Sequence, residues 1–287
     1  MSLDKKRILL VAPRMSGYSY WSLRGQLKME GKKRQGPSLP LLLIAAMLPD
    51  DRYELRLIDM ELTELGDSDL AWADAVFLSG MTADVLSMNE ALSRAKAVGR
   101  TTVLGGPHAI AFYPDIANVD CFVLGEAESV WPWFLADLDA GTLKKAYAAP
   151  ISEAERDALR SHFGTDAFYA PEGSPLPDLD CAPVPRFDLL EMGAYLQMHI
   201  QTMRGCPAQC EFCDVWRRFG RKVRVRSVEK VLAELDELYR LGWRGEIFFA
   251  NDNLIGDRGY AKKLLAAIAR WQVEHGRPFL FSGEGSL

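Results

Sequence analysis

The chain has 287 residues, of which 48% are hydrophobic and 25% charged, and its formal net charge is −5. This balance is typical of a globular protein and gives no strong field for nucleic acid or anionic lipid. No apolar run at the N-terminus has the form of a signal peptide, and residues 7–13 are too few to span a bilayer, which takes about 20 apolar residues. Five cysteines, three of them clustered, favour free thiols in a reducing compartment, so we expect a cytoplasmic protein without a membrane span.

The first half of the chain alternates short apolar runs with helix-length segments. Five runs, each closed by Gly, Pro or Asp, predict buried parallel strands: residues 7–13, 53–60, 74–80, 101–106 and 121–126. Between several of them lie helical patterns, notably over residues 83–100 and 126–141. This alternation predicts an α/β fold with a doubly wound, Rossmann-like domain over residues 1–145, in which ligands bind at the carboxyl ends of the strands.

Residues 146–195 break this rhythm and are predicted to be an interdomain linker, since residues 170–190 are rich in Pro and acidic side chains. A second βα series is predicted within residues 196–287. Its strands are expected at residues 196–203, 246–252 and 278–285, and its helices at residues 227–242 and 258–276, with Ser227 as an N-cap.

Three cysteines, Cys206, Cys210 and Cys213, lie in a loop directly after a predicted strand. Thiolates suit zinc or iron–sulfur clusters, but a structural zinc site normally has four Cys or His ligands. No second C-x-x-C pair supplies a fourth ligand, because Cys121 and Cys181 lie in a predicted strand and in the linker. A cubane cluster held by three cysteines would leave one iron open to an exogenous ligand, and a zinc loop completed by a distant histidine is the alternative.

The C-x3-C-x2-C spacing, with Phe212 before the last cysteine, resembles the signature of radical S-adenosylmethionine (radical SAM) enzymes. The resemblance implies that the three cysteines bind a 4Fe-4S cluster, whose open iron takes S-adenosylmethionine and whose electron releases a 5′-deoxyadenosyl radical. It also implies that Phe212 lies against the adenine. Asn251, Asp252 and Asn253 stand where the family commonly has Gly-Gly-Glu, and Glu284 ends the next strand. We predict that Asn251 and Asn253 bind cofactor and that Asp252 and Glu284 are catalytic, although a polar turn or a surface acid is the alternative for each.

Two strand ends in the first domain carry small residues, which let a bulky flat ligand approach the backbone. The predicted cofactor-binding residues there are Ser79, Gly80 and Met81, then Gly105, Gly106, Pro107 and His108. Beside the cysteine motif they resemble the lower half of the cobalamin-binding fold, where such residues line the slot for the nucleotide tail. The Asp-x-His-x-x-Gly loop of that fold is absent, which implies cobalt without a histidine from the loop after the first strand. Tyr18, Tyr20 and Trp21 of that loop could cover the corrin or pack internally.

Across nearly the whole chain, further segments resemble the B12-binding-domain radical SAM proteins and, among them, the hopanoid methylase group. The segments are "LGEAE" (124–128), "PVPRFDL" (183–189), "LYRLGWRG" (238–245) and "NDNLIG" (251–256). This resemblance implies methyl transfer from methylcobalamin to an unactivated carbon of a lipid-like or other hydrophobic substrate, with an external one-electron donor such as flavodoxin or ferredoxin. An enzyme like the anaerobic Mg-protoporphyrin monomethyl ester oxidative cyclase shares the same motifs, and a non-catalytic cobalamin-binding module is the alternative outside the enzymes.

The barrel of this family has about six βα units. A full barrel of eight such units takes about 250 residues, so six units need far more than the 92 residues from 196 to 287. Only three strands are predicted after the linker. We therefore expect residues 196–287 to form the N-terminal part of a radical SAM (β/α) partial barrel, in a sequence that looks truncated.

Overall fold

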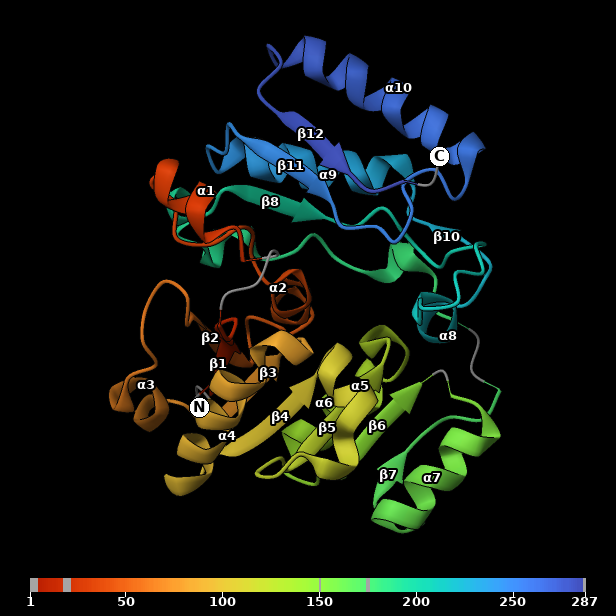
Figure 1. The fold of residues 1–287 in the computed structure, drawn as a ribbon. Helices are drawn as coiled ribbons and strands as arrows, with labels where there is room; N and C mark the ends of the chain where they lie inside the picture. Colours follow the sequence, from red (N-terminus) through yellow and green to blue (C-terminus); the bar gives the residue numbers. More distant parts are fainter. Residues whose placement is uncertain (1–4, 18–21, 150, 174–175, 286–287) are drawn as a thin grey trace. The chain divides into compact units, whose positions relative to one another are not determined.

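The structure is a computed structural model that describes residues 5–17, 22–149, 151–173 and 176–285 (Figure 1). The chain divides into two compact α/β units. Unit 1 comprises Met1–Ser22 and Met47–Pro177, and unit 2 comprises Leu23–Ala46 and Asp178–Leu287. Unit 1 is therefore interrupted after its first strand by a segment that belongs to unit 2. In the described ranges, no helix combines the length and the apolar character needed to cross a membrane.

Unit 1 is built on one parallel sheet of seven strands in the order β2-β1-β3-β4-β5-β6-β7. The strands are β1 (Lys6–Ala12), β2 (Tyr53–Asp59), β3 (Ala75–Ser79), β4 (Thr101–Gly105), β5 (Cys121–Gly125), β6 (Ala146–Ala149) and β7 (Phe168–Tyr169). The helices are α3 (Asp67–Trp72), α4 (Val85–Ala97), α5 (Pro107–Phe112), α6 (Trp131–Ala140) and α7 (Glu153–Phe163). The first five strands fall on the five predicted apolar runs, which confirms the doubly wound fold.

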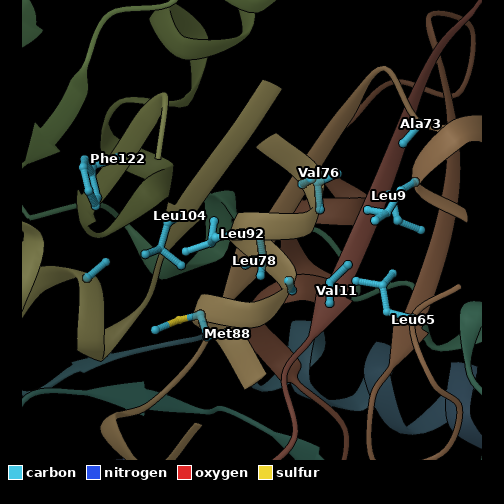
Figure 2. Packing of buried hydrophobic residues seen from close by; sticks show 14 of the residues in the cluster. Leu9, Val11, Leu65, Ala73, Val76, Leu78, Met88, Leu92, Leu104 and Phe122 are labelled. Carbon is cyan, nitrogen blue, oxygen red and sulfur yellow. The ribbon is translucent and has the colours of Figure 1, made fainter. Parts of the chain in front are cut away.

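Both faces of this sheet are covered by helices. On one face, Leu9, Val76 and Leu104 pack with α3, α4, α5 and α7 in a single hydrophobic cluster (Figure 2). On the other face, the ring of Phe134 in α6 lies 5.8 Å from that of Phe77. Burial on both sides explains why β1, β3 and β5 read as continuous apolar runs, whereas polar residues interrupt the edge strand β2.

β6, α7 and β7 lie inside the segment that the sequence predicted as a linker. β6 reads AYAA, and alanine has little intrinsic preference for strands, so the pattern gave no strand signal there. α7 begins with a capping box, in which the Ser152 hydroxyl accepts from the Glu155 backbone N–H and the Glu155 carboxylate accepts from the Ser152 backbone N–H. Residues 178–195 belong to unit 2 and contain three short 3-10 turns, Leu179–Cys181, Phe187–Leu189 and Met192–Ala194.

Unit 2 contains a parallel sheet of three strands in the order β12-β11-β8. The strands are β8 (Gln197–Ile200), β11 (Glu246–Phe249) and β12 (Leu280–Gly283), and the helices are α1 (Arg24–Met29), α2 (Leu39–Ala46), α8 (Val215–Phe219), α9 (Val228–Arg240) and α10 (Arg258–Glu274). α9 and α10 are the two connecting helices that the sequence predicted. Ser227 caps α9 as expected, because its hydroxyl accepts from the Lys230 backbone N–H at 3.4 Å.

The segment between β1 and β2 covers the outer edge of β8. Arg34 forms a parallel bridge with Tyr195, and the backbone N–H groups of Leu196 and Gln197 donate to the carbonyl oxygens of Arg34 and Gln35, both at 2.9 Å. An edge strand otherwise presents unpaired backbone groups, so this pairing completes that side of the sheet. Residues 33–35 therefore extend the sheet of unit 2, although they precede most of unit 1 in sequence.

Candidate cofactor-binding sites

The three clustered cysteines lie on one excursion of the chain, which we call the cysteine loop (residues 205–223). The loop leaves the sheet at β9 (Met203–Arg204) and returns at β10 (Arg224–Val225), and these two short strands pair antiparallel. Cys206 and Cys213 are partly exposed and Cys210 is exposed. Phe212, between the last two cysteines, is 93% exposed and presents its ring to solvent.

Gly205 begins the cysteine loop in a conformation that suits glycine. Its φ is +94°, and a Cβ at this position would lie 2.7 Å from the Lys222 carbonyl oxygen and 3.1 Å from that of Gly220. The Cys206 backbone N–H donates to the same Gly220 carbonyl at 3.3 Å. The two ends of the loop therefore meet backbone to backbone, which brings the first cysteine next to the loop's return.

The end of β11 runs beside the start of the cysteine loop. A hydrogen bond from the Gly205 backbone N–H favours the charged form of the Asp252 carboxylate, yet burial dominates and raises the Asp252 pKa above its ordinary value. Asn253 is buried, and its side-chain oxygen accepts from the Ile255 backbone N–H at 3.3 Å. The carbonyl oxygen of Glu284 accepts from the Leu254 backbone N–H at 2.8 Å, while its side chain is exposed. The structure thus brings Asp252, Asn253 and the backbone of Glu284 to one edge of the sheet, where Asp252 lies beside the start of the cysteine loop.

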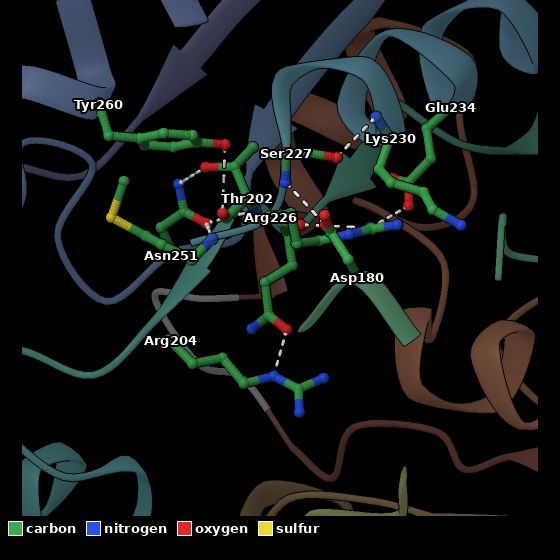
Figure 3. A network of polar contacts seen from close by, with 11 residues as sticks. Asp180, Thr202, Arg204, Arg226, Ser227, Lys230, Glu234, Asn251 and Tyr260 are labelled. Carbon is green, nitrogen blue, oxygen red and sulfur yellow. Dashed lines mark hydrogen bonds and ion pairs between the residues drawn. The ribbon is translucent and has the colours of Figure 1, made fainter. Parts of the chain in front are cut away.

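Asn251 has a different environment, because it is only 6% exposed and its amide is used inside the protein (Figure 3). Its side-chain oxygen accepts from the backbone N–H groups of Thr202 at 2.8 Å and Met203 at 3.2 Å. Its side-chain nitrogen donates to the Thr202 hydroxyl at 2.9 Å. Asn251 therefore binds the residues that lead into the cysteine loop.

A buried ion pair joins the other end of the loop to α9. Arg226, directly after β10, donates to the Glu234 carboxylate, and the side chains of the two residues are only 7% and 1% exposed. Burial raises the pKa of Glu234 to about 7, although the guanidinium of Arg226 opposes this shift. Within the described residues, Nε and Nη2 of Arg226 and Oε2 of Glu234 have no hydrogen-bond partner, which is consistent with a costly burial of charge.

The three thiols of the cysteine loop are suitable ligands for an iron–sulfur cluster. Among the described residues, no three His, Cys, Asp or Glu side chains converge so that they could hold one ion. In a cubane cluster, however, each cysteine binds a different iron, so its ligands do not converge on one point. Three thiols on one loop with a closed base fit this requirement. Of the other two cysteines, Cys121 is fully buried in β5, where burial raises the pKa of its thiol far above the ordinary range.

The second predicted site lies in unit 1, where the order β2-β1-β3 reverses the direction of winding. At such a switch point the loops after β1 and β3 separate, and ligands of doubly wound sheets bind there. Met81, after β3, is 60% exposed. Gly106, after β4, has φ +89°, and a Cβ there would lie 2.6 Å from the Ser79 hydroxyl oxygen and 3.2 Å from the Gly80 nitrogen. The loops after β3 and β4 therefore pack closely because both carry small residues.

His108 is buried beside this edge rather than exposed on it. Its ring lies 4.9 Å from that of Phe112, and Nδ1 lies 3.4 Å from the Thr82 hydroxyl. Burial lowers the pKa of His108, while the Asp84 carboxylate opposes the shift. In this environment the ring packs against Phe112, and burial favours the neutral form of the imidazole. The aromatic residues Tyr18, Tyr20 and Trp21 lie outside the described residues.

Two domain families match the chain, and their order is that of the two predicted sites. Residues 33–133 match the B12 binding domain and residues 200–282 match the Radical SAM superfamily. The chain belongs to the radical SAM proteins that carry a B12 binding domain.

Two relatives are similar to this chain over almost its whole length. The chain is 35% identical over 283 residues to an uncharacterized methyltransferase of Synechocystis sp., and 32% identical over 285 residues to the hopanoid C-2 methylase of Rhodopseudomonas palustris. Each alignment covers 98% of this chain but only 48% and 50% of the relatives, so the chain spans about half the length of the curated relatives it matches. The fold resembles that of the radical S-adenosylmethionine methyltransferase TsrM of Kitasatospora setae, with a TM-score of 0.66 at 16% identity over 94% of this chain and 52% of that one.

The sequence alone missed the polar residues that close the base of the cysteine loop, namely Thr202, Arg226, Glu234 and Tyr260. Thr202 and Arg226 flank the paired strands β9 and β10, whereas Glu234 and Tyr260 lie on α9 and α10, so only the tertiary structure brings the four residues together.

Proposed function

We propose that this chain contributes the cofactor-binding parts of a cobalamin-dependent radical SAM methyltransferase, acting on an unactivated carbon of a lipid-like or other hydrophobic substrate. The observation that carries the proposal is the cysteine loop. This loop bears three free thiols, its two ends are paired with each other, and it starts beside the carboxyl edge of a parallel sheet. The similarity to hopanoid C-2 methylase supports the hydrophobic substrate. A reducing compartment such as the cytoplasm suits these exposed thiols.

In this proposal, Cys206, Cys210 and Cys213 hold a 4Fe-4S cluster in unit 2. When bound, the cluster would supply the electron that cleaves S-adenosylmethionine into methionine and a 5′-deoxyadenosyl radical, and methylcobalamin would supply the methyl group. Phe212 is free to cover the adenine because its side chain is almost fully exposed. An external donor such as a flavodoxin or ferredoxin would reduce the cluster.

Asp252 and Glu284 are the carboxylates that we propose for proton handling and orientation at this edge. The raised pKa of Asp252 keeps part of its population protonated at a higher pH than an exposed carboxyl, so the group can donate as well as accept. Asn253 is proposed to contribute backbone and amide groups beside it. In unit 1, the residues proposed to line the cobalamin site are Ser79, Gly80, Met81, Gly105, Gly106, Pro107 and His108.

The test is anoxic reconstitution of the chain with iron, sulfide and hydroxocobalamin, followed by absorbance and electron paramagnetic resonance (EPR) spectra. We expect an oxygen-sensitive cluster of about four irons and four sulfides per chain in the wild type, and none in Cys206→Ala. Tightly held zinc without inorganic sulfide would overturn the proposal.

Labelled S-adenosylmethionine then separates methyl transfer from oxidative cyclisation: a labelled methyl group in the product supports the methyltransferase, whereas 5′-deoxyadenosine with an unlabelled product supports a cyclase-like reaction. Cobalamin binding without any cleavage would indicate a binding module.

A further inference from the structure

Thr202 is the point at which three elements of unit 2 are tied to the chain that enters the cysteine loop. It is fully buried, and every polar group of the residue has a partner (Figure 3). Its backbone N–H and its hydroxyl bond to Asn251 at the end of β11. Its carbonyl oxygen accepts from the Arg226 backbone N–H at 2.9 Å and from the Tyr260 hydroxyl, on α10, at 3.4 Å.

The side-chain oxygen of Asn251 has no capacity left for a cofactor. A carbonyl oxygen has two lone pairs, and here both accept backbone N–H groups, from Thr202 and Met203. With 6% of its surface exposed, Asn251 faces inward from the strand end. Removing this side chain would leave two buried N–H groups without partners, which is far more costly than losing one exposed contact.

This arrangement reaches Cys206 over a short and constrained stretch of chain. Met203 and Arg204 are paired with Val225 and Arg224, and Gly205 is held against the backbone of the returning strand. Because Arg226 bonds to Thr202, the bonds of Asn251 fix both ends of the loop relative to β11. Fixing the ends of a loop removes conformational freedom from everything between them.

We propose, on the basis of the function proposed above, that Asn251 is a positioning residue that locks the base of the cysteine loop through Thr202 and Met203, and does not itself contact S-adenosylmethionine. Asn251 thereby sets how firmly Cys206 holds the cluster and which backbone dipoles face its sulfur. Groups that orient metal ligands commonly change metal affinity by about 10–100-fold when they are removed.

The experiment compares Asn251→Leu with Gln272→Leu in the reconstituted chain. Gln272 is a matched control, because its amide also bridges backbone groups: it donates to the Phe279 carbonyl at 2.6 Å and accepts from the Phe279 N–H at 3.3 Å, at the opposite end of the strands. The first measurement, without S-adenosylmethionine, is the rate at which a chelator removes cluster iron, together with the EPR g values of the reduced cluster. The second is the change in those g values on adding S-adenosylmethionine.

We expect Asn251→Leu to lose iron about ten times faster than the wild type and to shift the g values before any S-adenosylmethionine is added. Gln272→Leu should lower thermal stability but keep both cluster properties. If Asn251→Leu has a wild-type cluster and loses only the response to S-adenosylmethionine, Asn251 is a direct ligand and our inference is wrong. A wild-type result in both measurements also overturns it.

A gentler variant covers the case in which Asn251→Leu does not fold. Thr202→Val is nearly isosteric and removes only the hydroxyl that bonds to Asn251, whereas Thr202→Ser keeps it. We expect faster iron loss in Thr202→Val and recovery in Thr202→Ser, and equal rates in the two variants would contradict the inference. If the wild type itself binds no cluster, the proposed function fails, whereas a stable wild-type cluster with unaffected variants removes only the role of Asn251.

Discussion

Gly205 and Lys222 meet at the two ends of the cysteine loop so closely that a side chain on Gly205 would lie 2.7 Å from the Lys222 carbonyl oxygen. Real Cβ atoms essentially never make contacts below about 3 Å, so a side chain at this position would force the backbone of the loop to shift. The left-handed φ of +94° adds a second requirement for glycine at the same residue. Gly205, the residue before Cys206, is thus constrained both by its backbone conformation and by the atoms packed against it.

The first prediction concerns this closure. Gly205→Ala should open the base of the cysteine loop and reduce the iron and sulfide bound after anoxic reconstitution to less than about half of the wild-type amount, because loosely held ligands lose metal readily. Gly242→Ala is the matched control, since Gly242 has φ +87° but no atom within 4 Å of the added Cβ. Both variants pay about 1–2 kcal/mol for the left-handed backbone, but only Gly205→Ala adds a clash. Equal cluster contents in the two variants would refute this role for the loop base.

The second prediction concerns the proposed cobalamin site. Gly106→Ala should displace the loop after β3, because its Cβ would lie 2.6 Å from the Ser79 hydroxyl oxygen and 3.2 Å from backbone atoms of Gly80. We expect weaker binding of hydroxocobalamin, measured by titration of its visible absorbance. Gly99→Ala has a similar φ of +71° in open space and should bind hydroxocobalamin like the wild type. Unchanged affinity in Gly106→Ala would place the cobalamin site elsewhere.

The third prediction concerns the segment that completes the edge of β8. A Cβ on Gly36 would overlap the imidazole ring of His199, so Gly36→Ala should lower the free energy of unfolding by about 1–3 kcal/mol, as overpacking does. Gly25→Ala, in α1 with nothing within 4 Å, should be neutral or slightly stabilising because alanine favours helices. Urea denaturation gives the two values. Hydrogen exchange should report the loss in β8, whereas exchange confined to β1 and β2 would show that Gly36 supports unit 1 instead.

The fourth prediction is a pH dependence. Burial raises the pKa of Glu234 from its ordinary value of 4.5 to about 7, so between these values the folded protein binds the proton more tightly than the unfolded chain. The stability that protonated Glu234 contributes is therefore complete below about pH 4.5 and is lost as the pH rises through about 7. Relative to Glu234→Gln, the wild type should become less stable from pH 5 to pH 8 in urea denaturation.

Glu237→Gln on the same helix is the control for this pH dependence. A hydrogen bond from Arg240 lowers the pKa of Glu237, so its contribution changes only at more acidic pH. The difference between Glu237→Gln and the wild type should stay constant from pH 5 to pH 8. A constant difference for Glu234→Gln as well would mean that Arg226 keeps Glu234 ionised in the folded state.

The sequence was most informative where one element carries its own pattern. β1, β3 and β5 are continuous apolar runs buried on both faces, and α9 has both a serine cap and a terminal glycine, so these elements could be predicted closely. The cysteine motif also needs no partner from elsewhere in the chain. The short strand β6 was not predicted, because its alanines have no marked preference for strands. Pairing with β5 places it in the sheet.

At the candidate site, too, local features could be predicted from the sequence and long-range contacts could not. The sequence identified Asn251 as a polar strand end, but its orientation follows from tertiary contacts with Thr202 and Met203, which lie about fifty residues away. The pairing of residues 33–35 beside β8 is a long-range contact of the same kind, and no local propensity in that basic segment predicts it. The positions of chemistry-bearing residues could be read from the sequence, whereas the direction in which their side chains point could not.

The placement of Leu23–Ala46 in unit 2 has a consequence for how such proteins can be recombined. The chain passes between the two units three times, after Ser22, after Ala46 and after Pro177. A single crossover between two homologous genes would therefore always join part of one unit from the first gene to the remainder of that unit from the second gene. An exchange that kept both hydrophobic cores whole would have to move two separate stretches of DNA together, so we expect the two cofactor modules to be inherited as a pair.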